Sequence, residues 1–359
     1  MIEQELRGAL AALAEGLPAR QATAAVERLI ATYRGAIPTA APVLRDRADV
    51  VAYAAYRMPA TFAAATAALD ALAERAPGWA PASHLDVGGG TGAAIWAAEA
   101  VWAGPRTTRV VDWAEPALAL GRELAGKAGA DSLRGAEWRR TSLRGAGGAG
   151  TGSGAQATPP TPATPPTPGT PATGGELPTS DLVTVSYVLG ELTPEDRAAT
   201  VAAAVGAARQ AVVLVEPGTP DGYQRILAAL DALVAAGLRV LAPCPHSAAC
   251  PLVPGEDWCH FATRVSRSSL HRRVKGGELA YEDEKFSYVA AVREIPGDPA
   301  PEPAHARVVR KPLLRKGQVI LDLCEESGSV VRRTVTKRDA PRYRAARDTP
   351  WGAPWPPPG

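Results

Sequence analysis

The first 80 residues carry large apolar side chains at helical spacing. In QATAAVERLIATYRG (21–35) and FAAATAALDALAERA (62–76), these side chains recur at helical intervals within an Ala-rich background. Such spacing places them on one face of a helix. We therefore expect residues 1–80 to form a helical region that packs against the rest of the chain.

Beyond residue 82 the pattern changes to short β-rich runs separated by helical stretches. Strands that alternate with helices predict a parallel, doubly wound α/β sheet. One helix is expected in TPEDRAATVAAAVGAAR (193–209), where Thr193 can cap the first turn and Pro194 suits its start. The predicted strands are HLDVG (84–88), TRVVD (108–112), DLVTVSYVL (181–189), QAVVLVEPG (210–218), RVLAPC (239–244) and KFSYVAAVR (285–293).

Two further segments depart from this alternation. Residues 145–175 contain only Gly, Ala, Thr, Pro, Ser and Gln, which predicts a disordered surface insertion between two strands of one sheet rather than a linker between domains. After residue 300, short β-branched runs flank a Glu-Ser-Gly turn, which predicts a small β module. The sequence thus divides into a helical region (1–80), an α/β domain (81–300) and a basic β module (301–359).

Charge is unevenly distributed along the chain. The formal net charge is only +2, yet residues 260–347 hold 19 basic and 11 acidic side chains, against 20 and 25 in residues 1–259. The carboxyl-terminal part should therefore attract anions. Its basic runs, near Tyr281, Tyr343 and Trp351, favour phosphate neutralisation and base stacking on RNA over a merely solvated basic face. These runs are RVSRSSLHRRVK (264–275), RVVRKPLLRK (307–316) and VVRRTVTKRDAPRYRAAR (330–347).

The amino terminus does not read as a targeting leader. In MIEQELRGALAALAEGL (1–17), Glu3 and Glu5 stand where a basic leader would begin. No apolar run approaches the roughly 20 residues that span a bilayer. The basic side chains are 33 Arg and 6 Lys in an Ala-rich background, which suggests a GC-rich bacterial genome. We expect a cytoplasmic protein that binds no membrane and keeps its cysteines reduced.

HLDVGGGTGAAIWAAEAVW (84–102) reads as a strand, a glycine loop and a helix. Loop glycines let the backbone approach a ligand closely, and the helix start offers free N–H groups. Asp112 ends the next strand, where a carboxylate can accept hydrogen bonds from both ribose hydroxyls of an adenosine-type cofactor. The pattern D-x-G-x-G-x-G resembles motif I of class I methyltransferases, which favours S-adenosylmethionine over NAD, although G-x-G-x-x-A is also satisfied. The predicted cofactor-binding residues are Asp86, Gly88, Gly90, Gly92 and Asp112.

No catalytic base can be named from the sequence. SYVLGEL (186–192) follows the fourth strand, where methyltransferases of base amino groups carry an Asn/Asp/Ser-Pro-Pro-aromatic motif that is missing here. Pro243 and Cys244 form the dipeptide of cytosine-C5 methyltransferases, but they follow the sixth strand. Glu191 and Glu216 end strands on the cofactor side; they could contact a ligand, but we favour a role as helix-start or turn carboxylates.

Three of the four cysteines lie in one Pro-rich segment, CPHSAACPLVPGEDWCHF (244–261), and the fourth lies in VILDLCEESG (319–328). The spacing C-x5-C-x8-C in such a loop argues against scattered core cysteines. Four thiolates suit either a tetrahedral zinc or an iron–sulfur cluster, and the gaps are wider than in typical structural zinc sites. The predicted metal ligands are Cys244, Cys250, Cys259 and Cys324, with His246 and His260 as surrounding donors or RNA contacts rather than ligands.

Over about residues 40–355 the chain resembles a family of methyltransferase-like proteins first described as a mitochondrial small-ribosomal-subunit protein in yeast, with an animal assembly factor and bacterial relatives. The likeness rests on the glycine loop and on SYVLGEL, LVEPGTPDGY, CPHSAACPL, DWCHFATRV, FSYVAAVR, LDLC and ARDTPWGAPWP. It implies a class I methyltransferase fold with seven strands, S-adenosylmethionine on the glycine loop, a [4Fe–4S] cluster on the four cysteines, with zinc as the alternative, and binding of small-subunit rRNA.

The resemblance leaves open whether methyl transfer occurs. A catalytically inactive rRNA-binding assembly factor is the alternative to an rRNA methyltransferase, and an NAD-dependent oxidoreductase would leave the basic module unexplained. The chain lacks the transit peptide of the mitochondrial members, so a mitochondrial location does not carry over. We expect a monomer when free and no binding to DNA. If the four thiols share one centre, that centre fastens the β module to the α/β sheet.

Overall fold

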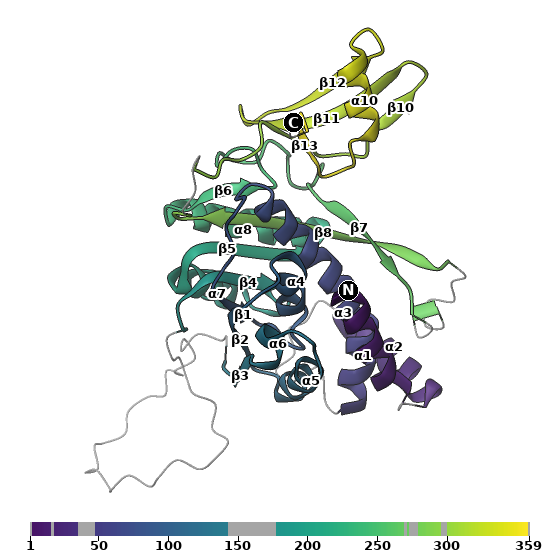
Figure 1. The fold of residues 1–359 in the computed structure, drawn as a ribbon, viewed down its shortest axis with the longest axis vertical. Coiled ribbons are helices and arrows are strands. Elements are labelled where there is room, and N and C mark those ends of the chain that lie inside the picture. The colour runs from purple at the N-terminus through teal and green to yellow at the C-terminus, as the bar shows by residue number, and fades with distance from the viewer. Residues whose placement is uncertain are drawn as a thin grey trace, which may run out of the picture.

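The computed structural model describes residues 2–15, 18–34, 47–142, 177–268, 271–272, 279–295 and 300–357. Within them the chain forms amino-terminal helices, a large mixed sheet covered by helices on both faces, and a smaller antiparallel sheet at the carboxyl end (Figure 1). The predicted insertion at 145–175 lies outside the described residues. The strands before and after it belong to the same sheet.

The large sheet has the strand order β3-β2-β1-β4-β5-β8-β6, and β7 pairs with β8 at its edge. The strands β1 to β6 run parallel, whereas β8 is antiparallel to both β5 and β6. An all-parallel dinucleotide-binding sheet has the order 3-2-1-4-5-6, so the reversed strand between β5 and β6 confirms the predicted methyltransferase fold. The strands are β1 (Ser83–Val87), β2 (Thr107–Asp112), β3 (Glu137–Arg140), β4 (Ser180–Ser186), β5 (Ala208–Pro217), β6 (Arg239–Ala242), β7 (Phe261–Ser266) and β8 (Tyr281–Val292).

The pattern of alternating strands and helices had predicted a wholly parallel sheet, and β8 departs from it. A parallel neighbour requires a crossover, usually through a helix. Between β6 and β8 the chain instead passes through the cysteine segment and β7, and β7 turns back into β8 as an antiparallel pair. The strand predicted at 285–293 is therefore the second half of a longer strand that begins at Tyr281.

Helices cover the two faces of the large sheet. On one face, α3, α4 and α5 share a core with the strands around Trp96, Leu118 and Leu124; on the other, α7 and α8 pack around Val201, Leu230 and other apolar side chains. The predicted helices at the amino terminus are confirmed by α1, α2 and α3, and α3 packs against β5, β6, β7 and β8 (Figure 1). The helices are α1 (Ile2–Glu15), α2 (Ala19–Arg34), α3 (Arg47–Ala73), α4 (Ala93–Val101), α5 (Glu115–Gly126), α6 (Asp131–Arg134), η1 (Leu189–Glu191), α7 (Pro194–Ala207) and α8 (Pro220–Ala235).

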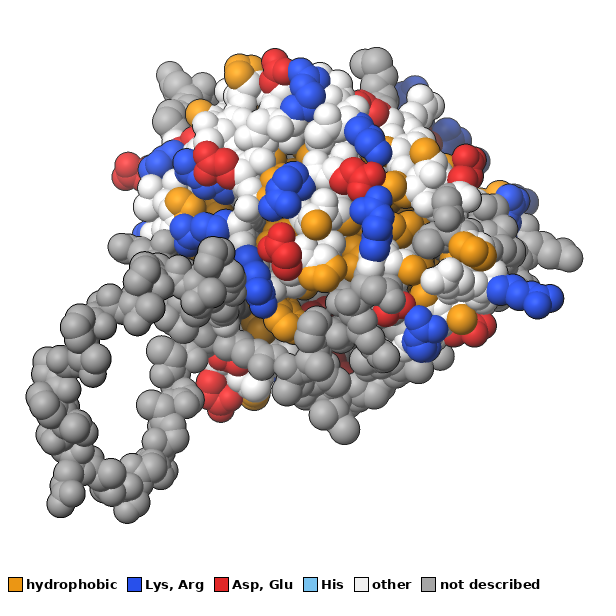
Figure 2. All heavy atoms as spheres, turned by 90° about the horizontal axis from the view of Figure 1, so that it is seen from below, with side chains coloured by type: hydrophobic (Ala, Val, Ile, Leu, Met, Phe, Trp, Pro, Cys, Tyr) orange, Lys and Arg blue, Asp and Glu red, His pale blue; other side chains and the backbone are white. Residues whose placement is uncertain are grey.

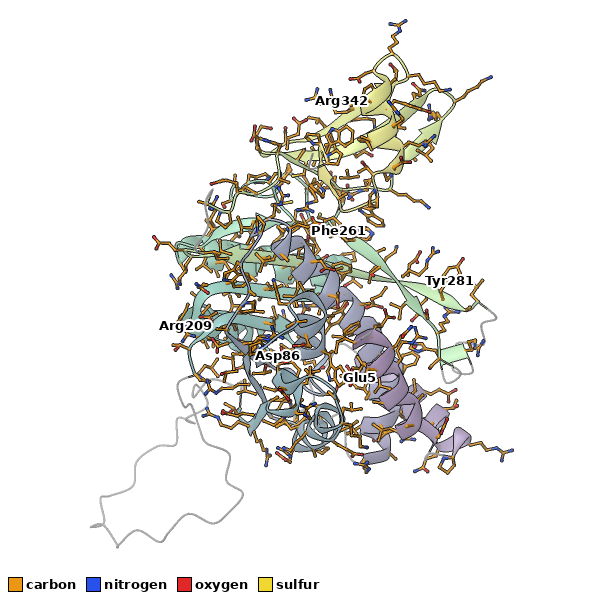
Figure 3. All side chains as sticks on the ribbon, in the orientation of Figure 1. Glu5, Asp86, Arg209, Phe261, Tyr281 and Arg342 are labelled. Atoms are coloured by element: carbon orange, nitrogen blue, oxygen red, sulfur yellow. The ribbon has the colours of Figure 1, made fainter. Side chains whose placement is uncertain are left out.

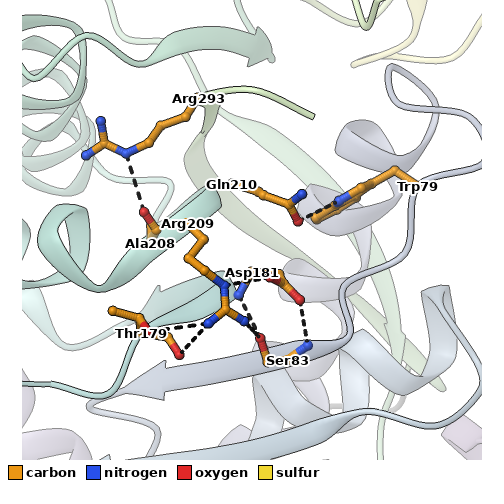
Figure 4. A network of polar contacts seen from close by, with 8 residues as sticks. All are labelled: Trp79, Ser83, Thr179, Asp181, Ala208, Arg209, Gln210 and Arg293. Atoms are coloured by element: carbon orange, nitrogen blue, oxygen red, sulfur yellow. Dashed lines mark hydrogen bonds and ion pairs between the residues drawn. The ribbon is translucent and has the colours of Figure 1, made fainter. Parts of the chain in front are cut away.

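A polar network locks the amino ends of three neighbouring strands (Figure 4). Arg209, near the start of β5, donates from Nε to Oδ1 of Asp181 at 2.9 Å and from Nη2 to Oγ of Ser83 at 2.7 Å. The Ser83 amide donates to Oδ2 of Asp181 at 3.0 Å. Because these contacts fix the relative register of β1, β4 and β5, the carboxyl ends of the same strands meet at the opposite edge, where the glycine loop lies.

The smaller sheet, here called the C-terminal sheet, is antiparallel with the order β10-β11-β9-β13, and β12 pairs with β11. Its own core contains Val308, Leu321, Leu323 and Trp355, with α10 packed against it. In the part of the chain that the structure describes, no helix is both long and apolar enough to cross a bilayer. The remaining elements are β9 (Ala306–Val308), β10 (Leu313–Arg315), β11 (Gln318–Glu325), β12 (Val330–Thr336), α10 (Ala340–Asp348) and β13 (Pro354–Trp355).

Candidate functional site

The glycine loop joins the carboxyl end of β1 to the start of α4. Gly88, Gly90 and Gly92 have φ angles of +69°, +54° and +84°, a region that favours glycine. A Cβ at Gly88 would lie 2.7 Å from Cγ2 of Val188, whereas one at Gly90 would meet only Oδ2 of Asp112, at 3.9 Å. The loop therefore packs tightly at Gly88 and leaves room beside Gly90.

Asp112, at the end of β2, closes onto this loop. Its Oδ2 accepts a hydrogen bond from the Gly90 amide at 2.9 Å, and its Oδ1 accepts one from the Ala114 amide at 2.8 Å. Burial raises the pKa of the carboxyl group, while these amide bonds lower it. Each carboxylate oxygen has a second lone pair. The room beside Gly90 and a carboxylate at its edge fit the sugar of a nucleoside cofactor.

Asp86 lies beneath the loop, fully buried, and Figure 3 labels it at the centre of the large sheet. Its Oδ1 accepts from the Thr184 hydroxyl at 2.7 Å, and Oγ1 of Thr184 also lies 2.8 Å from Nε2 of the buried His84. Oδ2 of Asp86 has no hydrogen-bond partner among the described residues and would contact a Cβ at Gly89. Burial raises the pKa of this carboxyl to about 7. Asp86 thus supports the loop from below, without an exposed face.

Tyr187, which the sequence did not single out, sits just past β4 beside the glycine loop. It is a non-glycine residue with a positive φ of 60°, a conformation that costs energy and tends to persist at functional sites. Its hydroxyl donates to Oε1 of Glu284 at 3.0 Å, and the guanidinium of Arg57 lies 5.6 Å from its ring centre. Arg57 in turn pairs with Glu284 through both nitrogens, at 2.9 and 3.3 Å.

This triad ties α3, the end of β4 and β8 together. Burial raises the pKa of the Tyr187 hydroxyl well above its usual value, so the hydroxyl stays protonated at neutral pH. Glu216 is engaged as well: it accepts from the Leu189 amide at 3.1 Å and from Nε of Arg225 at 2.6 Å. Its role is therefore the structural one that we favoured.

The four cysteine thiols converge between the two sheets. Cys244, Cys250 and Cys259 lie in the segment between β6 and β7 and are partly buried, while Cys324 on β11 is buried. We call the place where they meet the cysteine junction. Burial raises the pKa of the Cys244 thiol well above its ordinary value, and the charges of the other three thiols raise it further. Such mutual effects require the four side chains to be near one another.

Two further side chains contact these thiols. Nε2 of His246 lies 3.4 Å from Sγ of Cys324, and the hydroxyl of Tyr223 donates to Sγ of Cys250 at 3.2 Å. Burial raises the pKa values of Cys259 and Cys324 to about 12. Without a cation to stabilise thiolates, these groups stay protonated at neutral pH.

Among the described residues, no three Cys, His, Asp or Glu side chains stand close enough together to ligate one metal ion. A tetrahedral zinc holds its sulfur ligands about 2.3 Å away, whereas a cube of iron and sulfide holds four thiolates farther apart. The four thiols therefore do not form a single-ion site in the described part of the structure.

Aromatic side chains pack together beside the cysteine segment. The indole of Trp258 stacks on His260, with ring centres 5.2 Å apart, and Trp351 meets His260 edge-on at 5.1 Å. Phe261, labelled in Figure 3 near the meeting point of the two sheets, packs against Trp351 as well. Trp351, which we predicted to stack on RNA bases, is thus part of this packing, and its indole N–H is buried.

The predicted basic runs are only partly available to a ligand. In the first run, Arg264 pairs with Asp283 and Arg267 with Glu282, while residues 269–270 and 273–275 lie outside the described part. Tyr281 is exposed. It lies at the end of the β7–β8 pair that points away from the C-terminal sheet, and the label of Arg342 marks that sheet (Figure 3).

The C-terminal sheet keeps exposed cations. Arg332 and Arg333 on it pair with Asp322 and Glu325. The exposed basic side chains here without a carboxylate at ion-pair distance, within the described ranges, include Lys311, Arg315, Lys316, Arg338 and Arg344. On the face at the opposite end of the molecule, basic, acidic and apolar side chains are interspersed (Figure 2).

Comparison with solved structures finds similar chains among methyltransferases at low identity. A magnesium protoporphyrin IX methyltransferase from Synechocystis with bound S-adenosylmethionine aligns with a TM-score of 0.37 at 13% identity, covering 66% of this chain and 81% of that one. A putative RNA methyltransferase from Pyrococcus horikoshii aligns with a TM-score of 0.37 at 14% identity, covering 75% and 96%. The fold assignment rests on the strand order.

Sequence comparison gives a sharper result. The human mitochondrial ribosome assembly protein METTL17 is 28% identical over 320 residues, which cover 84% of this chain and 61% of the relative. The chain therefore spans less than two thirds of that relative's length. The family model described as mitochondrial small ribosomal subunit Rsm22 matches residues 47–356. From the glycine loop through the cysteine junction to the C-terminal sheet, the chain belongs to the Rsm22 family.

Proposed function

We propose that this protein is an assembly factor of the small ribosomal subunit in the bacterial cytoplasm, that it binds S-adenosylmethionine at its glycine loop, and that it carries a [4Fe–4S] cluster. The matching family is described as a small ribosomal subunit protein, and the human relative as a ribosome assembly protein. The matched region includes all the residues on which the proposal depends.

The observation that carries the proposal is the meeting of four thiols between the large sheet and the C-terminal sheet. Three of them come from one loop and the fourth, Cys324, from β11. Because metal binding free energy is partly folding free energy, a centre here fixes the C-terminal sheet beside the cofactor loop. One rigid body then presents both to RNA.

Support for a cluster over zinc comes from the spacing of the cysteines along the chain. The gaps of five and eight residues between Cys244, Cys250 and Cys259 are wider than in typical structural zinc sites, and no three Cys, His, Asp or Glu side chains among the described residues stand close enough together to hold one metal ion. Structural zinc is the second candidate for this centre.

Binding to rRNA is supported by the exposed cations of the C-terminal sheet. Lys316 and Arg338 are exposed there and lie beyond ion-pair distance of every described carboxylate. Side chains of this kind neutralise phosphates and release counterions. No feature predicts reading of a DNA duplex.

A methyl-transfer activity is the second candidate function, and the glycine loop favours it. S-adenosylmethionine supplies an electrophilic methyl group when bound. The two candidate side chains at the ends of β4 and β5 already have hydrogen-bond partners and are not free to accept a proton. Tyr187 donates to Glu284, and Glu216 accepts from Arg225. This arrangement favours cofactor and RNA binding without turnover.

Anaerobic purification followed by iron, sulfide and zinc analysis and an absorption spectrum tests the cluster. About four iron and four sulfide per chain with iron–sulfur absorption is expected; stoichiometric zinc without sulfide would contradict it. Incubating small-subunit rRNA with methyl-labelled cofactor tests turnover. Binding of rRNA without label transfer is expected, and no rRNA binding at low salt would refute the assembly role.

A further inference from the structure

Arg307 is a buried cation that lacks an acidic partner. The side chain lies on β9, is only 2% exposed, and is among the largest fully buried side chains. The other arginine that is buried among the described residues, Arg106, pairs with Glu99 at 2.9 Å. No carboxylate lies within ion-pair distance of Arg307 among the described residues.

The hydrogen bonds of Arg307 go to neutral carbonyl groups. Its Nε donates to the carbonyl of Pro243 at 3.0 Å and its Nη1 to that of Gly352 at 2.8 Å, while Nη2 has no partner among the described residues. Burying a guanidinium costs several kcal/mol unless opposite charge compensates it. Two carbonyl groups do not supply that charge.

Two of the four cysteines, Cys324 and Cys244, lie next to Arg307. Arg307 is the cross-strand neighbour of Cys324 in the β9–β11 register, and it bonds the residue that precedes Cys244. A second cation, Arg75, lies near enough to Arg307 for that charge to lower its pKa after burial, while Glu74 raises the pKa.

We propose that Arg307 is the charge-compensating residue of the cysteine junction, neutralising part of the negative charge that four thiolates bring to a bound metal centre. The inference rests on the proposed metal centre and applies to a cluster or to zinc. Four thiolates around a [4Fe–4S] core of charge +2, or around zinc, leave a net charge of −2. Arg307 reduces this charge, and its buried Nη2, which has no hydrogen-bond partner among the described residues, has donors to spare.

The proposal predicts opposite effects in the two metal states. With metal bound, the thiolate ligands bring negative charge beside Arg307. Without metal, Arg307 is a buried cation with no carboxylate at ion-pair distance among the described residues. Arg307→Met should therefore weaken the centre of the loaded protein, yet leave the metal-free protein as stable as wild type or more so. If Arg307 only donated hydrogen bonds to the carbonyl groups of Pro243 and Gly352, its removal would destabilise the metal-loaded and the metal-free protein equally.

The experiment reconstitutes full-length protein anaerobically with ferrous iron and sulfide and follows loss of iron–sulfur absorption in excess EDTA. We expect loss to be at least tenfold faster for Arg307→Met and Arg307→Gln than for wild type, with partial rescue in Arg307→Lys, which keeps the charge. The cluster's reduction potential should be more negative in Arg307→Gln, because a nearby cation stabilises the reduced form. Arg315→Met, exposed on β10, is the matched control.

Thermal unfolding of the metal-free proteins completes the test. Arg307→Met unfolding no earlier than wild type supports charge compensation. Two results would overturn the role of Arg307 without refuting the metal centre. One is an equal cluster lifetime in wild type and Arg307→Met, and the other is a metal-free Arg307→Met protein that is clearly less stable than wild type. A wild-type protein that takes up neither iron nor zinc would overturn both.

Discussion

The Gly90 amide donates to Oδ2 of Asp112 at 2.9 Å, so the end of β2 and the glycine loop are held together at the predicted sugar position. Asp112→Asn cannot accept at both oxygens and should weaken binding of S-adenosylmethionine at least tenfold, or about 1.4 kcal/mol. Calorimetric titration measures this effect. Asp231→Ala, exposed on α8, is the control. Equal affinities would remove Asp112 from the cofactor site.

Asp86 predicts a pH dependence of stability. Burial raises the pKa of its carboxyl from 3.8 to about 7, so between these values the folded protein holds a proton that the unfolded chain releases. The stability of wild type therefore falls as pH rises through this window, and the loss is complete above pH 7.

Asp86→Asn removes this titration while it keeps an acceptor for the Thr184 hydroxyl. The variant should gain free energy of unfolding relative to wild type on going from pH 5 to pH 8, by a few kcal/mol. Denaturant unfolding at both pH values measures the gain. A pH-independent difference between the two proteins would contradict burial of an ionisable group at this position.

Cys324 links the C-terminal sheet to the cysteine junction. Cys324→Ser removes one thiol ligand and should loosen that sheet, so that a protease cuts after Leu314, an exposed residue on β10, several-fold faster than in wild type. Limited proteolysis with mass spectrometry follows the cut. Ser327→Ala, in the turn after β11, should leave the rate unchanged. Equal resistance of Cys324→Ser and wild type would argue against a shared centre.

The exposed cations of the C-terminal sheet predict salt-dependent RNA binding. When Arg315→Gln, Lys316→Gln and Arg338→Gln are combined, the slope of log affinity against log salt should become shallower by up to about 2.1 to 2.7 units, since each phosphate contact contributes about 0.7 to 0.9. Filter binding with small-subunit rRNA at several salt concentrations measures it. Arg122→Gln, on α5, serves as control. An unchanged slope would place the RNA elsewhere.

Removal of the Tyr187 hydroxyl tests whether this side chain at the end of β4 has a structural or a catalytic role. Tyr187→Phe loses the bond to Glu284 and should destabilise the protein by about 1 kcal/mol, with cofactor affinity unchanged. Chemical denaturation and calorimetry report the two quantities. Loss of a measurable methyl-transfer rate without loss of stability would instead assign the hydroxyl to catalysis.

Local pattern was sufficient for much of this protein. The glycine loop depends on positive φ angles, which glycine adopts because of its own lack of a side chain. Thr193 caps α7 as expected, because capping involves only the first turn of the helix. Three cysteines within sixteen residues are confined to one loop by chain length alone. For these features the interacting groups are close in sequence, and so the sequence by itself determined them.

Tertiary structure decided the rest. Three features depend on contacts between residues that are far apart in the sequence. They are the antiparallel direction of β8, the packing of Trp351 against His260 and the positive φ of Tyr187. Arg307 looked like one member of a basic run, but pairing of β9 with β11 and β13 buries it beside Cys324. A side chain's charge is written in the sequence, whereas its solvation depends on which distant segments fold over it.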